Sequence, residues 1–519
     1  MKMEPGKKSY SSLVPSIADI LFVSVFLYLS FAAGMGLLAD CDTGYHVRTG
    51  EYILNSHSIP RHDIFSHLTP PIPWTAHEWL SEVFMALIHR AFGLTGIVIF
   101  FAFVIAVTYY LLFKRILADR PNILVAVLVI MLVIGSSQIH WLARPHVFSL
   151  LLTVLWYGLL DDFQYNNKNY LYVLPLIMLL WVNLHGGYII SFVLTGIYLA
   201  GDLLKFFFST GQVKSEYRQK VKSLGFAILA CLIAALINPY GYHILLFPFK
   251  LTANKFIMDN VQEFLSPNFH ESMIFTYLLF FMVAIFAISR QNLNIIQLVL
   301  ILLFSYMSLY SARYIPLFGI IAAPILTRQG DLVLKQYPGR FTAFLGKRAG
   351  RIASVDKSAR GYIWPVISVL LVVFLVAAGK AEYRFDENIK PVAAVEFLKK
   401  EHIKGNMFNN DEFGDYIIYE ASPEYKVFFD GRSDMYGEAR MKEYFKVIRI
   451  EPGWKDVIEK YGITWIIYDA KSVLSRFLLE GKDWKLVYSD KVANIFMKNI
   501  PENRKWIEKY NNVKPISGL

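Results

Sequence analysis

The chain has 519 residues, of which 55% are hydrophobic and 16% aromatic, and its mean hydropathy is +0.40. This composition excludes an ordinary soluble protein and indicates a polytopic α-helical membrane protein. Residues 380–519 hold 24 basic and 23 acidic side chains, so nearly all of the net charge of +11 lies in residues 1–379. The charge therefore reflects membrane topology and gives no support to a nucleic-acid partner.

Eleven apolar segments are candidate membrane spans. They lie at 17–38, 93–113, 121–139, 146–160, 170–183, 188–208, 223–238, 273–289, 294–311, 313–327 and 361–379. Several are shorter than the roughly 20 residues that a full crossing needs. If the N-terminus is cytoplasmic, Lys and Arg divide 21 to 7 in favour of the inner segments, which predicts an extracytoplasmic first loop and C-terminal region.

The first loop, residues 39–92, is dense in carboxylates and imidazoles. Asp42 and His46 are four residues apart in a stretch compatible with a helix, so both side chains are expected on one helical face. This spacing suits a catalytic carboxylate that takes a proton or binds a metal, with an imidazole beside it. Asp40 is a further catalytic candidate, although an aspartate at this place also suits a helix cap.

The end of this loop is a predicted amphipathic helix, TAHEWLSEVFMALIHRAFG. We expect it to lie in the membrane interface on the extracytoplasmic side. At its start, Glu78 is a candidate catalytic residue and His77 a candidate substrate-binding residue. Thr75 and Glu78 also have the spacing of a capping box, which explains Glu78 without any chemistry.

Polar residues recur at the outer ends of the later spans. Because such groups are costly at membrane depth unless they line a cavity, the sequence predicts a wet chamber that opens outward. Arg144 and Arg313 are candidates for binding phosphate, since guanidinium groups match phosphate oxygens, but both also suit interfacial anchors. The further substrate-binding candidates are His185, Tyr240 and Glu263.

Residues 380–519 are predicted to form an extracytoplasmic α/β domain after a membrane domain, residues 1–379. Helices are expected at 392–400, 440–447, 453–461 and 471–479, and strands at 405–410, 425–430, 464–469, 484–489 and 492–498. Residues 409–419 and 428–436 are expected as loops at strand ends, where ligands often bind. Asp430 and Arg432 are candidate substrate-binding residues, although Asp430-Gly431 equally suits an ordinary turn.

With these residues located, the layout resembles the C-type (GT-C) integral membrane glycosyltransferases, which include protein O-mannosyltransferases, oligosaccharyltransferase catalytic subunits and lipid A aminoarabinose transferases. Asp40-Cys41-Asp42 followed by His46 stands where these enzymes carry an acidic pair. The segment EFGDY, residues 412–416, is similar in part to an acceptor-binding motif of oligosaccharyltransferases. The runs DxDxxxHxRxGEYI, HEWLSEV, ARPHxFSL, NLHGG, NPYG and FFDGRSDMY are similar to a bacterial group within this superfamily.

The resemblance implies a multi-pass protein of the bacterial inner membrane. Its expected activity is transfer of a sugar from a polyprenyl-phosphate donor to an extracytoplasmic glycan, lipid or protein acceptor. Asp42 would act as base or metal ligand, and a divalent cation such as Mg²⁺ or Mn²⁺ is a candidate cofactor. Membrane lipid is the other expected partner.

Two other interpretations remain open. A transporter or flippase of a lipid-linked or small polar substrate would need a polar path through the membrane, whereas the ionisable residues cluster at one leaflet and no strong internal repeat is seen. A receptor or assembly module on an inert anchor fits eleven spans poorly.

Overall fold

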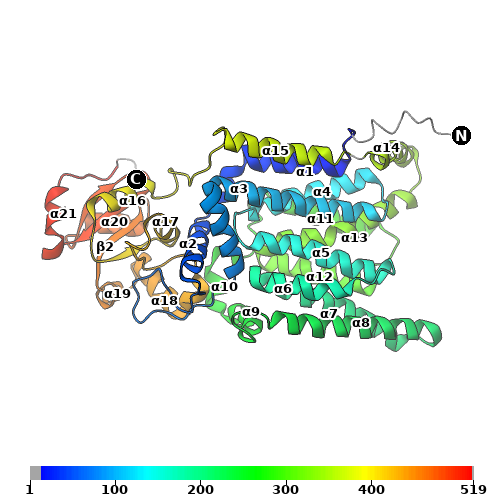
Figure 1. Ribbon diagram of the computed structural model, residues 1–519, viewed down its shortest axis with the longest axis horizontal. Helices are drawn as coiled ribbons and strands as arrows, with labels where there is room; N and C mark the ends of the chain where they lie inside the picture. Colours follow the sequence, from blue (N-terminus) through cyan, green and yellow to red (C-terminus); the bar gives the residue numbers. More distant parts are fainter. Residues whose placement is uncertain (1–12, 360, 517–519) are drawn as a thin grey trace. The chain divides into compact units, whose positions relative to one another are not determined.

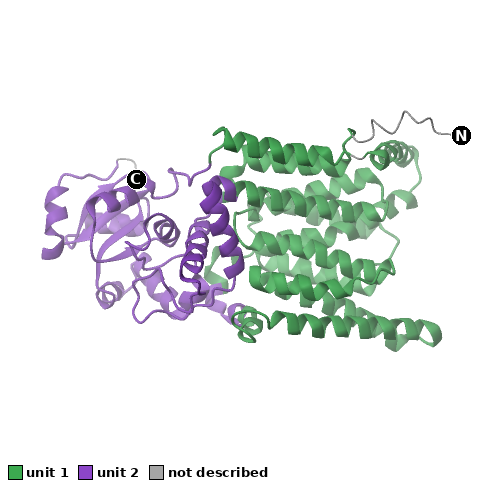
Figure 2. Cartoon of the chain, viewed as in Figure 1, with its two compact units in different colours: residues 1–37, 98–249, 258–382 green, residues 38–97, 250–257, 383–519 purple. Residues whose placement is uncertain are grey.

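The computed structural model describes residues 13–359 and 361–516; Lys2, Lys7, Lys8 and Arg360, which count toward the topology argument, lie outside them. The chain divides into two compact units (Figure 2). Unit 1 contains residues 1–37, 98–249 and 258–382, and unit 2 contains residues 38–97, 250–257 and 383–519. The predicted first loop therefore belongs to the same unit as the C-terminal region.

Unit 1 is built from helices; most are apolar and many pack side by side, whereas α14 is rich in lysine and arginine (Figure 1). They are α1 (Ile17–Leu27), the second part of α3 (Trp79–Ala118), α4 (Ile123–Ser137), α5 (His146–Tyr165), α6 (Leu174–Leu184), α7 (Ile189–Phe208), α8 (Gly211–Ala235), most of α9 (His243–Ala253), α11 (Ile274–Ile288), α12 (Ile295–Tyr310), α13 (Ile315–Gln336), α14 (Arg340–Ser358) and α15 (Ile363–Ala377). Helix α4 packs on α11 and α13, α7 packs on α8, and α1 packs on α15. Such contacts between membrane helices stabilise a bundle mainly through van der Waals packing.

Five helices of the described chain are long and apolar enough to cross a membrane, and the count is six if α14 and α15, bent by 71°, form one span. The five are Trp79–Ala118, Ile123–His140, His146–Tyr165, Gly186–Phe208 and Ala312–Gln336. Five more apolar helices are shorter: Ile17–Ala32, Leu171–Leu184, His243–Ala253, Ile274–Ile288 and Ile295–Tyr310. The predicted number of eleven spans thus remains a prediction, because half of the apolar helices are too short to count by length alone.

Helix α3 is interrupted at Gly93, where φ is 61° and ψ is −160°. A positive φ of this kind favours glycine, because a Cβ would clash with the backbone. The break separates Trp79–Phe92, the predicted amphipathic helix, from the apolar segment that follows. The amphipathic part belongs to unit 2.

Unit 2 combines helix α2 (Asp42–Ser56) and the first part of α3 with a four-stranded sheet. The strands are β1 (Asn406–Asn409), β2 (Ile463–Asp469), β3 (Trp484–Ser489) and β4 (Ala493–Lys498), in the order β1-β2-β4-β3. Strand β1 is parallel to β2, whereas β4 is antiparallel to both β2 and β3. The helices around it are α16 (Val392–Glu401), α17 (Asp411–Ala421), α18 (Ser433–Ile448), α19 (Trp454–Lys460), α20 (Val473–Glu480) and α21 (Arg504–Lys509).

Two predictions for the C-terminal region are wrong. Residues 425–430 are no strand of the sheet; instead the N–H of Val427 donates to the carbonyl of Phe65 at 3.0 Å, and its carbonyl accepts from His67 at 3.1 Å. Their alternating pattern thus reflects packing on a distant loop. Residues 411–421 form helix α17, not a loop, because the Asn410 side chain caps it by accepting from the N–H of Phe413 at 3.2 Å.

Helix α2 makes two close approaches to its neighbours. A Cβ on Gly44 would lie 2.8 Å from the carbonyl oxygen of Asp415 on α17, and a Cβ on Gly50 would lie 1.9 Å from that of Glu82 on α3. Both distances are shorter than any real Cβ contact, so only glycine allows this packing. The two glycines therefore determine where α2 presents its polar side chains within unit 2.

We expect Gly50→Ala to lower the thermal unfolding midpoint by at least about 3 °C, because the added methyl group forces α2 and α3 apart. Gly196→Ala in α7 is the control, since a Cβ there meets nothing within 4 Å and alanine favours a helix. Both midpoints are measured on detergent-purified protein, and equal midpoints would contradict the packing.

Candidate active site

The centre of the candidate site is a pair of buried carboxyl groups, Asp42 at the start of α2 and Asp415 on α17. Asp42 is 8% exposed and Asp415 is 2% exposed. The backbone N–H of Gly431 donates to both carboxyl oxygens of Asp415, at 3.1 and 3.2 Å. A Cβ on Gly431 would lie 2.3 Å from Oδ1 of Asp42 and 3.0 Å from Oδ2 of Asp415, so both carboxyl groups contact one glycine.

The environment of this pair disfavours two negative charges. Burial and the charge of Asp42 raise the pKa of Asp415 well above its usual range, and Asp430 and Asp40 add to the effect. Two interacting carboxyl groups in one site hold a proton between them over a wide pH range. Asp415 therefore favours its protonated form beside Asp42.

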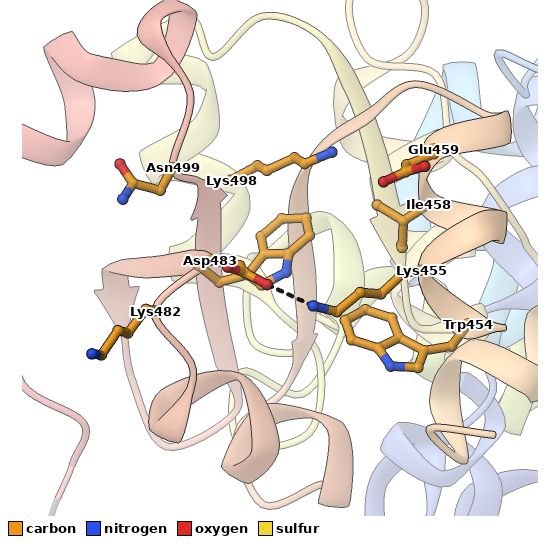
Figure 3. A pocket seen from close by; sticks show the side chains of 9 residues that line it. Trp454, Lys455, Ile458, Glu459, Lys482, Asp483, Lys498 and Asn499 are labelled. Carbon is orange, nitrogen blue, oxygen red and sulfur yellow. Dashed lines mark hydrogen bonds and ion pairs between the residues drawn. The ribbon is translucent and has the colours of Figure 1, made fainter. Parts of the chain in front are cut away.

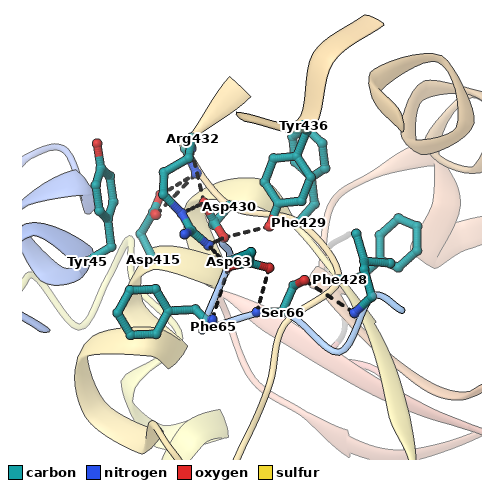
Figure 4. Close-up of polar contacts among 12 residues, drawn as sticks. Tyr45, Asp63, Phe65, Ser66, Asp415, Phe428, Phe429, Asp430, Arg432 and Tyr436 are labelled. Atoms are coloured by element: carbon teal, nitrogen blue, oxygen red, sulfur yellow. Dashed lines mark hydrogen bonds and ion pairs between the residues drawn. The ribbon is translucent and has the colours of Figure 1, made fainter. Parts of the chain in front are cut away.

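The loop that carries Gly431 is anchored by a buried guanidinium group (Figure 4). Nε and Nη2 of Arg432 donate to Asp430 at 2.8 and 2.7 Å, and Nη2 also donates to Oδ1 of Asp63 at 2.9 Å. The hydroxyl of Tyr436 donates to Asp430 at 2.6 Å, while the Trp74 ring centroid lies 4.6 Å from the guanidinium carbon. Arg432 is only 2% exposed, so its ion pairs are fully removed from water.

These contacts shift the ionisation of both partners. Burial opposes the charge on Asp63, but Arg432 and hydrogen bonds from Ser66 and Phe65 hold its pKa below the usual value. Burial likewise opposes the charge on Arg432, but Asp430 and Asp63 raise its pKa further above the usual range. The charge of Arg432 is therefore engaged by Asp430 and Asp63 and positions the loop next to the Asp42–Asp415 pair.

A second polar network joins α2 to the start of α3. Nδ1 of His46 lies 3.3 Å from Oε1 of Glu82, and Nε2 of His46 lies 3.7 Å from Oε2 of Glu78. Nε2 of His77 lies 3.7 Å from the other oxygen of Glu78. Glu82 and His46 are fully buried, whereas Glu78 and His77 are partly exposed, so the chain of groups leads from the interior toward solvent. Alternating carboxylates and imidazoles of this kind can pass a proton.

A cavity of about 10 Å³ borders this network and has space for about one water molecule. Its lining residues are Tyr45, Trp74, Ala76, His77, Glu78, Glu82, Arg432 and Asp434. Nη1 of Arg432 and Oε2 of Glu82 are buried atoms that have no hydrogen-bond partner among the described residues. Since a buried donor and a buried acceptor both belong to residues of this cavity, it suits one small polar group such as a hydroxyl or a water.

Three residues predicted from the sequence form a second cluster, within unit 1: Arg144, Glu263 and Arg313. Arg144 forms an ion pair with Glu263, and the guanidinium carbon of Arg313 lies 4.8 Å from the ring centroid of the adjacent Phe264. Burial opposes ionisation of Glu263, but Arg144 and Arg313 hold its pKa well below the usual range. Two guanidinium groups against one carboxylate leave an excess of positive charge, which suits a phosphate.

The remaining candidates have well-defined local contacts. Oδ1 of Asp40 accepts from the N–H of Asp42 at 2.7 Å, a turn contact just before α2, whose N-cap residue is Cys41. Nδ1 of His185 accepts from the N–H of Gly187 at 2.9 Å, in the turn between α6 and α7. Tyr240 follows Asn238, whose side chain accepts from the Tyr240 N–H at 2.9 Å. Each contact helps to shape a turn or helix start.

The described side chains form no cluster of metal ligands. In residues 13–359 and 361–516, no group of three or more His, Cys, Asp or Glu side chains is arranged to hold an ion. Asp42 and Asp415 are two neighbouring carboxyl groups, and the charge of Asp42 helps to raise the pKa of Asp415.

Sequence reasoning did not assign Glu82, Asp415 or Asp63 to the site. Glu82 follows Glu78 by one helical turn, a spacing that could have suggested a shared face. Asp415 lies in the EFGDY segment that resembles an acceptor-binding motif. Asp63 has no local signal, because its partner Arg432 is 369 residues away.

Among known proteins, the similarity lies in the structure. No protein-family model matches the chain, and no curated protein matches it. Among solved structures, the chain is similar to ArnT from Cupriavidus metallidurans bound to undecaprenyl phosphate, at 10% identity and a TM-score of 0.48, and to ArnT in the apo state, at 11% identity and a TM-score of 0.42. Both comparisons cover 92% of this chain and 97% of the other.

The raised pKa of Asp415 predicts a pH-dependent effect of Asp415→Asn. In the folded protein Asp415 keeps its proton above the unfolded value of about 3.9, so its contribution to stability falls as the pH rises past that value. The unfolding midpoint of Asp415→Asn, relative to the original protein, should therefore rise between about pH 4 and pH 8. Asp483→Asn is the control with the opposite sign, because Lys455 lowers the pKa of Asp483. A difference that is independent of pH would contradict the shared proton.

Arg432→Met should destabilise unit 2 strongly, because it leaves Asp430 and Asp63 buried without their cation. Removing one partner of a buried ion pair typically costs about 3–5 kcal/mol. Arg440→Met removes a half-buried guanidinium group that pairs with Glu443 and should cost less than about 1 kcal/mol. Urea unfolding, monitored by tryptophan fluorescence, measures the free energy of unfolding of both variants. Similar losses in the two variants would mean that the Arg432 ion pairs do not stabilise the loop.

Proposed function

We propose that this protein is a membrane glycosyltransferase that moves a sugar from a polyprenyl-phosphate donor to an extracytoplasmic acceptor. The observation that carries the proposal is the buried pair of Asp42 and Asp415, held against Gly431, because it provides a carboxylate with a tuned proton affinity. The resemblance of the Asp40-Cys41-Asp42 motif to the acidic pair of C-type glycosyltransferases supports the same assignment.

In this proposal Asp42 is the general base. Its carboxylate accepts the proton of the acceptor hydroxyl while the hydroxyl oxygen forms a bond to the anomeric carbon of the sugar. The bond between that carbon and the phosphate oxygen breaks, and the polyprenyl phosphate leaves with the electron pair. Asp415 lies beside Asp42 at Gly431, and burial and the charge of Asp42 raise the pKa of Asp415 well above its usual range.

His46 and Glu78 take the role of a proton relay. His46 lies one turn after Asp42 on α2, and the contacts of His46 with Glu82 and Glu78 continue toward His77. The relay would return the abstracted proton to solvent after each turnover. Asp430 and Arg432 act as positioning residues, because each is the buried partner of the other.

Arg144 and Arg313 are proposed to bind the phosphate of the donor. The support is local: both arginines lower the pKa of Glu263, and their combined charge exceeds that of the single carboxylate. Guanidinium groups stabilise the negative charge that develops on a leaving phosphate. His185 and Tyr240 remain candidates for contacts with the sugar or the lipid.

Asp42→Asn should lower sugar transfer by about 100-fold or more, because loss of a general base typically costs a factor of 10²–10⁴. The assay uses purified protein in liposomes with polyprenyl-phosphate sugars extracted from bacterial membranes, and mass spectrometry measures the polyprenyl phosphate released. Glu420→Gln is the control, since Glu420 pairs with Lys399 at a partly exposed position.

Two outcomes would count against the proposal. Transfer by Asp42→Asn at the original rate would remove Asp42 from the role of base. Movement of the donor across the liposome membrane without release of polyprenyl phosphate would favour the transporter interpretation.

A further inference from the structure

Helix α14 (Arg340–Ser358) differs in direction and composition from the helices that flank it in the chain. It follows α13, which is long and apolar enough to cross a membrane and ends at Gln336. It precedes the apolar helix α15, which begins at Ile363 and is bent by 71° relative to α14. Helix α14 therefore runs across the end of the bundle of unit 1, between two apolar helices that run along it (Figure 1).

One side of α14 is apolar and exposed. Phe341 and Phe344 are 70% and 54% exposed, and Ile352 and Val355 are exposed as well. With 3.6 residues per turn, these four side chains fall on one side of the helix, which we call the apolar side. The helix packs on α4, but Ala349 is its one buried side chain, so this packing leaves the apolar side uncovered. Large apolar side chains in such a cluster are unfavourable in water.

A basic strip lies next to the apolar side. Arg340, Lys347 and Arg351 recur at intervals of seven and four residues, so they lie almost in line along the helix. Arg348 is adjacent, and its guanidinium carbon lies 5.3 Å from the ring centroid of Phe344. Long basic side chains of this kind cover apolar surface with their stems and extend their charges toward the polar region of a membrane.

The one carboxylate of α14 does not neutralise this strip. The helix contains five Lys or Arg residues and a single acidic residue, Asp356. Oδ1 of Asp356 accepts the N–H of Ile17, at the start of α1, at 2.7 Å. Across residues 13–359 and 361–516, none of the five basic residues forms an ion pair. Helix α14 therefore favours a partner that presents several negative charges along a surface.

The lysines of unit 2 are arranged differently. In the cleft between α19 and the β3–β4 pair, Nζ of Lys455 donates to Asp483 at 2.7 Å, and Lys482 points away from Lys498 (Figure 3). These ammonium groups do not line up along one element, and the cleft borders no exposed apolar strip. A line of positive charge beside an exposed apolar side is the pattern of a helix that lies in a membrane interface.

We propose that α14 lies in the membrane interface and binds anionic phospholipids, with its apolar side among the acyl chains and its basic strip against the phosphate groups. A lipid surface accounts for both features at once, whereas a free phosphate ion would match the charge and leave the apolar side in water. This binding requires no sugar transfer, so the inference goes beyond the proposed function and does not depend on it.

The test measures which lipids surround α14 in the full-length protein. Ser354→Cys provides an exposed position on α14 for a fluorescent donor, because Cys41 and Cys231 are buried. Labelling of the protein without this substitution gives the background. The protein is reconstituted in vesicles of phosphatidylcholine with a minor fraction of phosphatidylglycerol. Energy transfer to trace amounts of either lipid, labelled on its acyl chain, reports the local abundance of that lipid.

We expect phosphatidylglycerol to be enriched at least about threefold over phosphatidylcholine near α14, because one basic residue at an anionic surface contributes about fivefold in affinity. The enrichment should fall as salt is raised. In the variant Lys347→Gln, Arg348→Gln, Arg351→Gln the ratio should approach one. The control variant Lys482→Gln, Lys485→Gln, Lys491→Gln removes the same charge from exposed positions of unit 2 and should keep the enrichment.

A second measurement tests the apolar side without any change of charge. Ile352 and Ser354 point to nearly opposite sides of α14. A dye on Ile352→Cys should therefore be quenched more strongly than a dye on Ser354→Cys by phosphatidylcholine that carries a nitroxide on its acyl chain.

Equal energy transfer to the two labelled lipids would overturn the proposal, and it is the result expected if an acidic protein covers α14 instead. Enrichment that persists in the α14 variant, or that is lost in the control variant as well, would also overturn it. So would equal quenching at the two dye positions. None of these outcomes affects the Asp42→Asn assay.

Discussion

The candidate active site depends on close approaches at glycine. Gly44 and Gly50 allow helix α2 to lie directly against the backbones of α17 and α3, and Gly431 lets two carboxyl groups contact one residue. Any larger side chain at these three positions would meet atoms closer than 3.0 Å. The geometry of Asp42 is therefore set by rigid backbone contacts rather than by flexible side chains, which is the kind of preorganisation that catalysis benefits from.

Electrostatics adds a second constraint, because the site contains more buried carboxyl groups than buried cationic groups. Arg432 is a deeply buried cation near this pair, and it is engaged by Asp430 and Asp63. Asp42 and Asp415 are then left to share a region in which one proton is favoured. A buried carboxyl group with a raised pKa beside a second carboxyl group is an arrangement that acid–base sites use.

Local patterns in the sequence predicted part of this arrangement. The four-residue spacing of Asp42 and His46 indicated a helix, which is α2, and the periodic apolar residues before Gly93 indicated the first part of α3. Strands β1 to β4 also follow from their composition. The loop at 409–419 and the strand at 425–430 were wrong, because a helix cap at Asn410 and pairing with residues 65–67 override the alternating pattern.

The contacts that sequence reasoning missed are those made over long distances along the chain. The Asp42–Asp415 pair and the Asp63–Arg432 ion pair each join segments more than 350 residues apart, and no local pattern specifies such a partner. The same separation affects how the protein is made. Residues 38–97 leave the ribosome long before residues 383–519, so the early segment must wait, with Asp63 exposed and its loop unsupported, until the whole intervening bundle has been synthesised. Truncation near the end of translation would thus leave the beginning of the chain without its folding partner.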